Sequence, residues 1–400
     1  MKLKSICISI VDAEHKTAPR ANEGFPSIRT PNIGKGRLKL EGVYRVSKET
    51  YIKWTRRAIP QANDLILARE APVGNVAIVP DNLNLCLGQR TVLIRPDTEK
   101  INPQFLCYYL LSDEIQNKMT GMSSGATVAH LNMKDIRELE LTFLPLLKTQ
   151  KRIADILSAY DDLIENNLKR IKLLEQAAQN IYKEWFVNLR FPRHENTPIN
   201  KETGLPDGWE EKEISTIITF LGGYAFKSKT YIENGKYRVI TIKNVGDKVF
   251  NASVGNSVSI IPEKMKEHCK IIEGDILLSL TGNVGRSCIA YGENNLLNQR
   301  VAKIEPINTR WRPYIYWMFN DNKIFSLMNN LATGAAQQNL SPVKLAKEKV
   351  VIPSESFIDL FCLKANSFFK QIILLNKQNQ KLKAARDILL PRLMNRTIKV

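Results

Sequence analysis

The stretch "GDILLSLTGNVGRSCIA", residues 274–290, repeats a phrase found earlier in the chain as "NDLILAREAPVGNVAIV", residues 63–79. Both copies run from an Asp through four mostly apolar residues to a polar break and then Val-Gly, and they begin 211 residues apart. Three further landmarks recur in the same order at offsets of 209 or 210 residues: Gln89-Arg90 with Gln299-Arg300, Gly125-Ala126 with Gly334-Ala335, and Leu131 with Leu340. Such a slowly drifting offset indicates a tandem duplication and predicts a pseudo-twofold internal repeat.

The bulk composition is that of a folded protein with a polyanionic partner. A chain of 400 residues with 44% hydrophobic residues has room for two domains, each with its own core. The formal net charge of +18 is spread over both halves, which favours nucleic acid as the partner over a surface that is basic by chance. No apolar run is long enough to cross a membrane and no export signal is recognisable, so we expect a cytoplasmic protein that does not bind membranes.

No arrangement of residues typical of a catalytic or metal site is found. The six cysteines and four histidines are dispersed, which predicts buried thiols and no metal site. "NPQF" at 102–105 departs from the N-P-P-[FY] motif of amino-methyltransferases at Gln104, and "PDGWEEK" at 206–212 spaces its acids too closely for a metal nuclease. P-loop and G-x-S-x-G motifs are absent. We therefore expect no catalysis and no bound cofactor in this chain, with an enzyme of degenerate motifs as the alternative.

Each half follows the same plan of secondary structure. Short β-rich runs such as "LILA" and "ILLSL" come first, bounded by Gly, Pro, Asn and Asp. Helical stretches that open with Pro and carry aromatic residues follow at 102–119 and 312–328, and these aromatics are better interpreted as core than as a platform for stacking bases. The prediction is an α+β fold with two similar mixed α/β domains, separated by two long helices that form an antiparallel coiled coil.

The long helices are predicted from apolar residues that step by four and three, as in a coiled-coil seam. Each seam contains one Asn, which typically sets the register of a pair at some cost in stability. Two unrelated surface helices are the alternative. The predicted seams are Ile153, Leu157, Tyr160, Ile164, Asn167, Ile171, Leu174, Ala178, Ile181 and Trp185, and Phe361, Ala365, Phe368, Ile372, Leu375, Asn379, Leu382, Arg386, Leu389 and Leu393.

These patterns define five segments. The first domain is predicted at 1–147 and the first long helix at 148–187. A polar connector rich in Pro and Gly covers 188–207. The second domain is predicted at 208–355 and the second long helix at 356–396.

The combination of motifs resembles the specificity subunit of type I restriction–modification systems, over nearly the whole chain. The resemblance is carried by "LPDGWEEKEI", "GDILLSLTGNVG", "IRTPNIGKGRL", "WTRRAIPQANDLILAREAPVG", "ARDILLPRLMNR" and the helix "QKRIADILSAYDDLIENNLKRIKLLEQAAQNIYKEWF". It implies that the two domains are target-recognition domains, each reading one half of a split DNA sequence. It also implies that the helix pair sets the gap between the half-sites.

The same resemblance implies the partners and the cofactors. Two modification (methyltransferase) subunits would carry S-adenosylmethionine, and restriction (motor-nuclease) subunits would use ATP and Mg²⁺. This chain would bind none of these cofactors itself, in agreement with the motifs that it lacks. A DNA-binding scaffold or regulatory protein without a modification partner stays open, whereas RNA fits the charge but not two domains held at a fixed spacing.

Residues of the types that contact phosphates and base edges are the candidates for double-stranded DNA contacts. A solvated surface charge is the alternative at each position. In the first domain they are Lys16, Thr17, Arg29, Arg56, Arg57, Arg69 and Arg90. In the second they are Lys227, Lys229, Arg238, Lys243, Asn283, Arg286 and Arg300. The polar loops at 124–131 and 333–340 could also face DNA.

Overall fold

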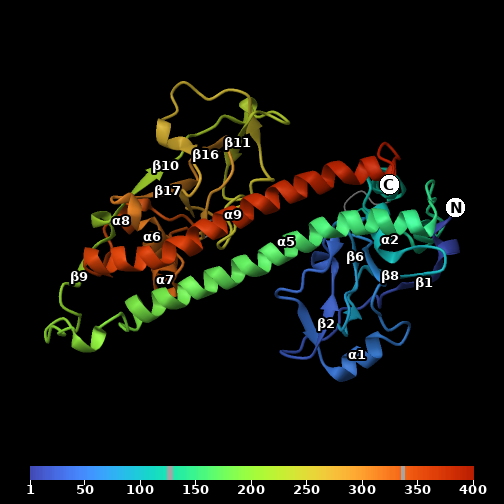
Figure 1. Cartoon of the computed structure of the whole chain (residues 1–400), viewed down its shortest axis with the longest axis horizontal. Helices are drawn as coiled ribbons and strands as arrows, with labels where there is room; N and C mark the ends of the chain where they lie inside the picture. Colours follow the sequence, from blue (N-terminus) through green and yellow to red (C-terminus); the bar gives the residue numbers. More distant parts are fainter. Residues whose placement is uncertain (124–128, 335–337) are drawn as a thin grey trace. The chain divides into compact units, whose positions relative to one another are not determined.

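The computed structural model describes residues 1–123, 129–334 and 338–400. These residues form two compact units, one made of 1–163 with 381–400 and the other of 164–380. Each unit contains a mixed α/β part and a portion of both long helices (Figure 1). The predicted domains, 1–147 and 208–355, exclude the long helices, whereas each compact unit contains part of both. The predicted domain limits therefore stay predictions.

In the first unit, a five-stranded sheet has the order β1-β8-β5-β6-β3 and a three-stranded sheet has the order β4-β2-β7. The larger sheet contains β1 (Cys7–Asp12), β3 (Gly36–Arg37), β5 (Leu65–Ala68), β6 (Val76–Ile78) and β8 (Thr91–Pro96). The smaller one contains β2 (Phe25–Ile28), β4 (Tyr44–Val46) and β7 (Cys86–Leu87). The helices are α1 (Lys48–Trp54), α2 (Pro103–Leu110), α3 (Asp113–Met122) and α4 (Met133–Glu138).

The second unit repeats this plan with a four-stranded sheet in the order β10-β17-β14-β15 and a second sheet in the order β12-β11-β16-β13. The first sheet contains β10 (Ile218–Gly222), β14 (Ile276–Ser279), β15 (Ser287–Ile289) and β17 (Val301–Pro306). The second contains β11 (Tyr237–Ile240), β12 (Ser257–Val258), β13 (Lys270–Ile271) and β16 (Asn295–Leu297). Also present are α6 (Arg312–Phe319), α7 (Asn322–Leu331), α8 (Pro342–Ala346) and the strand pair β9 (Glu210–Glu213) and β18 (Lys349–Ile352).

The pairing of strands follows the duplication that the sequence predicts. The order β1-β8-β5-β6 has its counterpart in β10-β17-β14-β15, all with antiparallel neighbours. In the smaller sheets β2 pairs in parallel with β7, as β11 pairs in parallel with β16. The repeat also differs between the units, since β3 joins only the first large sheet and β13 only the second small one.

The repeated phrase forms a β-hairpin in each unit, from β5 to β6 and from β14 to β15. Its Gly has a positive φ, +89° at Gly74 and +78° at Gly285. A Cβ at Gly74 would also lie 2.7 Å from the side-chain oxygen of Gln116. Glycine is therefore required at this turn. The Asp at the start of each phrase is buried and accepts a hydrogen bond from the backbone N–H three residues before it, as Asp64 does from Gln61 and Asp275 from Ile272.

The aromatic helices lie in the core of their units, as the sequence predicts. Tyr108 and Tyr109 of α2 and Tyr314, Tyr316 and Trp317 of α6 are each at most 2% exposed. The Asn102 side chain caps α2 by accepting a hydrogen bond from the N–H of Phe105, and Pro103 occupies the first helical position. Stacking of bases on these rings is excluded because the rings are not accessible.

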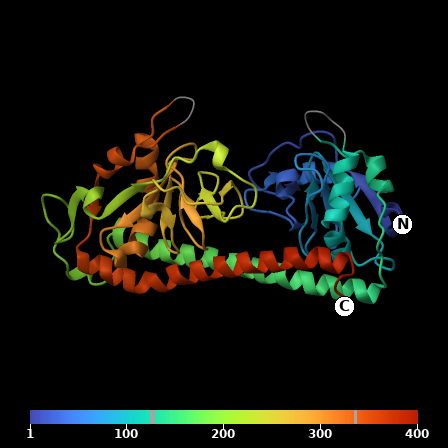
Figure 2. The ribbon, with the colours of Figure 1, turned by 90° about the horizontal axis from the view of Figure 1, so that it is seen from above.

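The long helices are α5 (Leu147–Tyr182), which continues in a π-helical turn at Lys183–Val187, and α9 (Glu355–Met394). Figure 2 shows them side by side, and contacts inside each unit establish that they are antiparallel. In the first unit Asp161 contacts Arg386, and in the second Asn167 donates a hydrogen bond to Asn379, 3.0 Å between Nδ2 and Oδ1. The two seam asparagines thus contact each other.

The structure buries the predicted seam residues to different degrees. Buried positions are Ile153, Leu157, Ile164, Asn167, Ile171, Ala178, Trp185, Phe361, Ala365, Ile372, Leu375, Asn379 and Leu393. Half-buried positions are Tyr160, Leu174, Ile181, Phe368, Leu382, Arg386 and Leu389. The described residues contain no helix that is long and apolar enough to cross a membrane.

Candidate nucleic-acid interface

The residues predicted to contact DNA are, with two exceptions, on the surface of their units. Arg238 is half-buried and Arg69 is buried. The exposed ones are Lys16, Thr17, Arg29, Arg56, Arg57 and Arg90 in the first unit, and Lys227, Lys229, Lys243, Asn283, Arg286 and Arg300 in the second. The polar loops at 124–131 and 333–340 lie partly outside the described residues, as do Gly125, Ala126 and Ala335.

Arg69 differs from the other predicted residues, because its side chain is buried and makes contacts inside the first unit. It is 6% exposed, and its Nη1 pairs with Asp12 Oδ2 at 2.6 Å. Its Nε donates to the carbonyl of Leu131 at 2.9 Å. A guanidinium group whose hydrogen bonds are already made inside the fold is not available to a phosphate or a base.

The same network extends to the surface through His130, which contacts both Arg69 and Glu70. Arg69 can only donate, so Nε2 of His130 accepts from Arg69 Nη2 at 2.8 Å. The ring proton therefore lies on Nδ1, which donates to Glu70 Oε1 at 2.7 Å. The other Glu70 oxygen pairs with Arg90 Nε at 2.9 Å. Arg90 is exposed, but its charge is balanced by Glu70.

A second basic cluster of the first unit is built around an aromatic ring. The guanidinium carbons of Arg20 and Arg29 each lie 5.5 Å from the ring centre of Tyr44 at the start of β4. Arg20 and Tyr44 are not among the residues predicted from the sequence. No sequence motif connects them with Arg29, although the three residues lie within one stretch of the chain, 20–44. Two stacked guanidinium groups beside a ring suit contacts with phosphates and base edges.

In the second unit two adjoining hollows bring several predicted residues together. One has a volume of 320 Å³ and is lined by Lys243 and Arg300 among others. The other has a volume of 460 Å³ and is lined by Arg238. Both share Tyr231, Gly255 and Asn256. Ser228, which lies between Lys227 and Lys229, lines the first hollow. Asn283 and Arg286 lie on the β14–β15 turn and line neither hollow.

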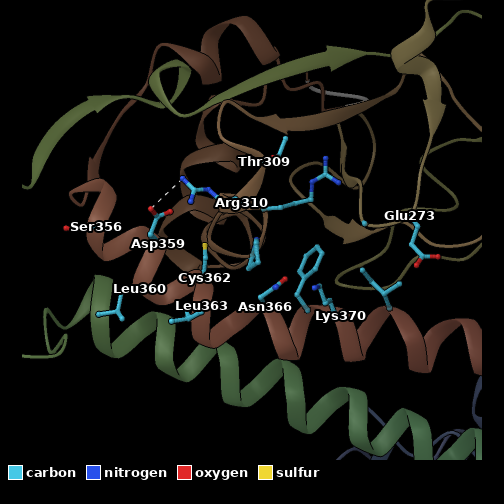
Figure 3. Close-up of a pocket in the computed structure, with 15 residues that line it drawn as sticks. Glu273, Thr309, Arg310, Ser356, Asp359, Leu360, Cys362, Leu363, Asn366 and Lys370 are labelled. Atoms are coloured by element: carbon cyan, nitrogen blue, oxygen red, sulfur yellow. Dashed lines mark ion pairs between the residues drawn. The ribbon is translucent and has the colours of Figure 1, made fainter.

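A larger groove, with a volume of 1050 Å³, lies in the second unit along α9 and the start of α6 (Figure 3). Leu363 of α9 lines it with 78% of its surface exposed. Arg310 and Asp359 form an ion pair of 3.9 Å at one end, and Lys370 and Glu273 lie toward the other. An apolar helix face with charges at both ends is a surface suited to a protein partner rather than to DNA.

Among the described residues, no group of three or more His, Cys, Asp or Glu residues could hold a metal ion. Together these features define a class of protein: a duplicated basic binding protein that presents two different polar surfaces on one scaffold. The chain belongs to the family of the type I restriction modification DNA specificity domain, whose family model matches residues 1–176 and 206–384. The two matched segments correspond to the two copies of the repeat.

Individual relatives agree with this assignment. The type I restriction enzyme MjaIX specificity subunit of Methanocaldococcus jannaschii is 24% identical over 374 residues, covering 88% of this chain and 81% of the relative. The HindI specificity subunit of Haemophilus influenzae is 24% identical over 402 residues, covering 85% and 87%. The crystal structure of the type I restriction-modification S subunit from M. genitalium has the same fold, with a TM-score of 0.58 at 18% identity over 98% of this chain and 95% of that one.

Proposed function

We propose that this chain is the DNA-recognition subunit of a type I restriction–modification complex, in which each domain reads one half of a bipartite target. The observation that carries the proposal is the duplication itself, with one scaffold bearing two different polar surfaces. Around Tyr44 the first unit stacks Arg20 and Arg29, whereas the second unit has open hollows at Lys243 and Arg300. Different surfaces on equal frameworks suit two different DNA sequences.

In this proposal the helix pair determines the gap between the half-sites. A helix of 36 residues, the length of α5, measures about 54 Å at a rise of roughly 1.5 Å per residue. Two half-sites lie on the same face of the duplex when they are about one helical turn of B-DNA apart. Affinity would come largely from phosphate contacts, so it would fall steeply as the salt concentration rises.

Catalysis and cofactors are assigned to the partners in this proposal. Modification subunits would bind S-adenosylmethionine and methylate adenine, and restriction subunits would use ATP and Mg²⁺. The chain itself would bind DNA in the cytoplasm without acting on it. The groove along α9 is the surface that we assign to a modification subunit, because Leu363 is exposed there beside charged residues.

The function is tested by expressing the chain with a cognate modification subunit in a host free of adenine methylation and mapping methyladenine over the genome. A single motif of two short halves around a fixed gap is the expected result. Methylation at a motif that is not split would refute the assignment of one half-site to each domain. A bound partner without any methylation would favour a DNA-binding scaffold.

Leu363→Glu is expected to weaken the binding of the modification subunit by roughly tenfold or more, because it places a charge in an apolar contact. Isothermal titration of the purified subunits measures the effect. The matched control is Leu374→Glu, on the same helix, also exposed (55%) and not part of the groove. Equal affinities of the two variants would show that the groove is not the docking surface.

A further inference from the structure

The Gln-Arg pair that recurs in the two halves lies on a rigid turn in the second unit. Gln299 and Arg300 connect β16 to β17. The N–H of Gln299 donates to the carbonyl of Tyr224, and the N–H of Arg300 donates to the side chain of Asn298. The carbonyl of Arg300 accepts from the N–H of Leu280 at 3.1 Å. Three hydrogen bonds therefore hold the backbone of this turn, while both side chains are exposed.

Both side chains line the hollow of 320 Å³. Among the described residues, neither the Gln299 amide nor the Arg300 guanidinium group forms a hydrogen bond or an ion pair. Around them the hollow presents the polar side chains of Ser228, Lys243 and Asn256. An amide and a guanidinium group on a fixed backbone have the donor and acceptor pattern that reads base edges in the major groove.

The matching pair in the first unit is engaged differently. The Gln89 oxygen accepts from the Thr17 hydroxyl at 3.2 Å, and its amide nitrogen donates to the carbonyl of His15 at 3.0 Å. Arg90 is ion-paired with Glu70 at 2.9 Å. Both side chains of this pair are thus occupied by the fold of their own unit.

One substitution within the repeat explains the difference for the arginine. At the offset of 211 residues that relates the hairpins, Glu70 corresponds to Thr281. Glu70 forms an ion pair with Arg90, whereas Thr281 has no charge, and its buried hydroxyl oxygen makes no hydrogen bond with any residue that the structure describes. Arg300 consequently has no ion pair with any described residue at the rim of the hollow.

We infer that Gln299 and Arg300 are specificity-determining residues of the second half-site, where the hollow receives the edge of one base pair, and that Gln89 and Arg90 do not serve this purpose in the first. The inference rests on the proposed function and deepens it. Guanine is the expected partner of Arg300, since its O6 and N7 accept the two hydrogen bonds that a guanidinium group donates. Lys243 beside it would contact a phosphate, which adds affinity without selectivity.

The test is a methyladenine map of the full complex with Arg300→Ala and with Gln299→Ala. The preference for the recognised base over the other bases is expected to fall by about 5- to 150-fold at one or two positions of one half-site. The motif then becomes degenerate at these positions, while the other half-site and the gap stay unchanged. Thr281→Glu, which copies the first unit, should reproduce the effect of Arg300→Ala by pairing with Arg300. Lys323→Ala, which removes an exposed positive charge of the same unit on α7, should leave the motif unchanged.

The outcomes separate this inference from the proposed function. A wild-type map without a split motif would overturn the proposed function and the inference together. A split wild-type motif that Arg300→Ala and Gln299→Ala both leave intact would overturn the inference alone. Thermal unfolding of each variant identifies a misfolded chain, and the two alanine variants remain decisive if Thr281→Glu does not fold.

Discussion

Replacing residues 1–147 with the corresponding domain of another specificity subunit is expected to change one half of the methylated motif and to leave the other half and the gap intact. The physical reason is that the two units have separate cores. The main core cluster of the second unit is made of residues between Ile171 and Leu375, and none of them belongs to 1–147. The readout is the methyladenine map of the chimeric complex.

The chimera must keep the contacts by which the exchanged segment binds its helix. Tyr108 donates a hydrogen bond to Asp161 at 2.6 Å, and Arg37 forms an ion pair with Asp162. A donor domain with Tyr and Arg at these positions is therefore the appropriate choice. The reciprocal exchange of 208–355 is the control and should change only the other half-site. A chimera in which both half-sites change would contradict the division of labour between the domains.

The framework of each unit could be predicted from the sequence because it depends on local signals that the duplication presents twice. The hairpin needs glycine at 74 and 285, and the helix α2 needs Asn102 and Pro103 at its start. Each signal acts within a few residues, so a single sequence is sufficient to read it. The seam of the helix pair follows the same logic, since the spacing of apolar residues places Asn167 and Asn379 on facing sides.

The interface was harder to predict because the role of a charged side chain depends on partners distant in the chain. Arg69 resembled the other basic candidates, yet Asp12 and His130 lie 57 and 61 residues away from it. Arg90 and Arg300 occupy matching places in the repeat, but Arg90 pairs with Glu70, whereas the residue that matches Glu70 in the second copy is Thr281.

The partners of the charged residues in the helix pair could not be predicted from the sequence either. Glu175 of α5 and Arg386 of α9 have different surroundings. Tyr316 donates to Glu175 at 3.4 Å, and burial raises the pKa of that carboxyl to about 7. Arg386 instead contacts Asp161, 2.5 Å between Nη1 and Oδ1.

Arg386→Ala is expected to lower the free energy of unfolding of the first unit by about 3–5 kcal/mol, because it leaves the Asp161 carboxylate buried without its cation. Asp161 is 5% exposed and is bound by Arg386 and Tyr108. Burial, and after it the Asp161 charge, raises the pKa of the Tyr108 hydroxyl, so this group stays a hydrogen-bond donor. Urea unfolding of the full chain measures the loss.

Two further variants determine whether the lost pairing is the cause. Lys169→Ala removes an exposed ion pair with Glu165 on α5 and should cost less than about 0.5 kcal/mol, because solvent already screens that pair. The double variant Asp161→Asn with Arg386→Met should recover most of the stability. It removes both charges, keeps an oxygen to accept from Tyr108 and fills the space of the arginine stem. If the double variant were as unstable as Arg386→Ala, the loss would come from packing of the arginine side chain and not from an unpaired carboxylate.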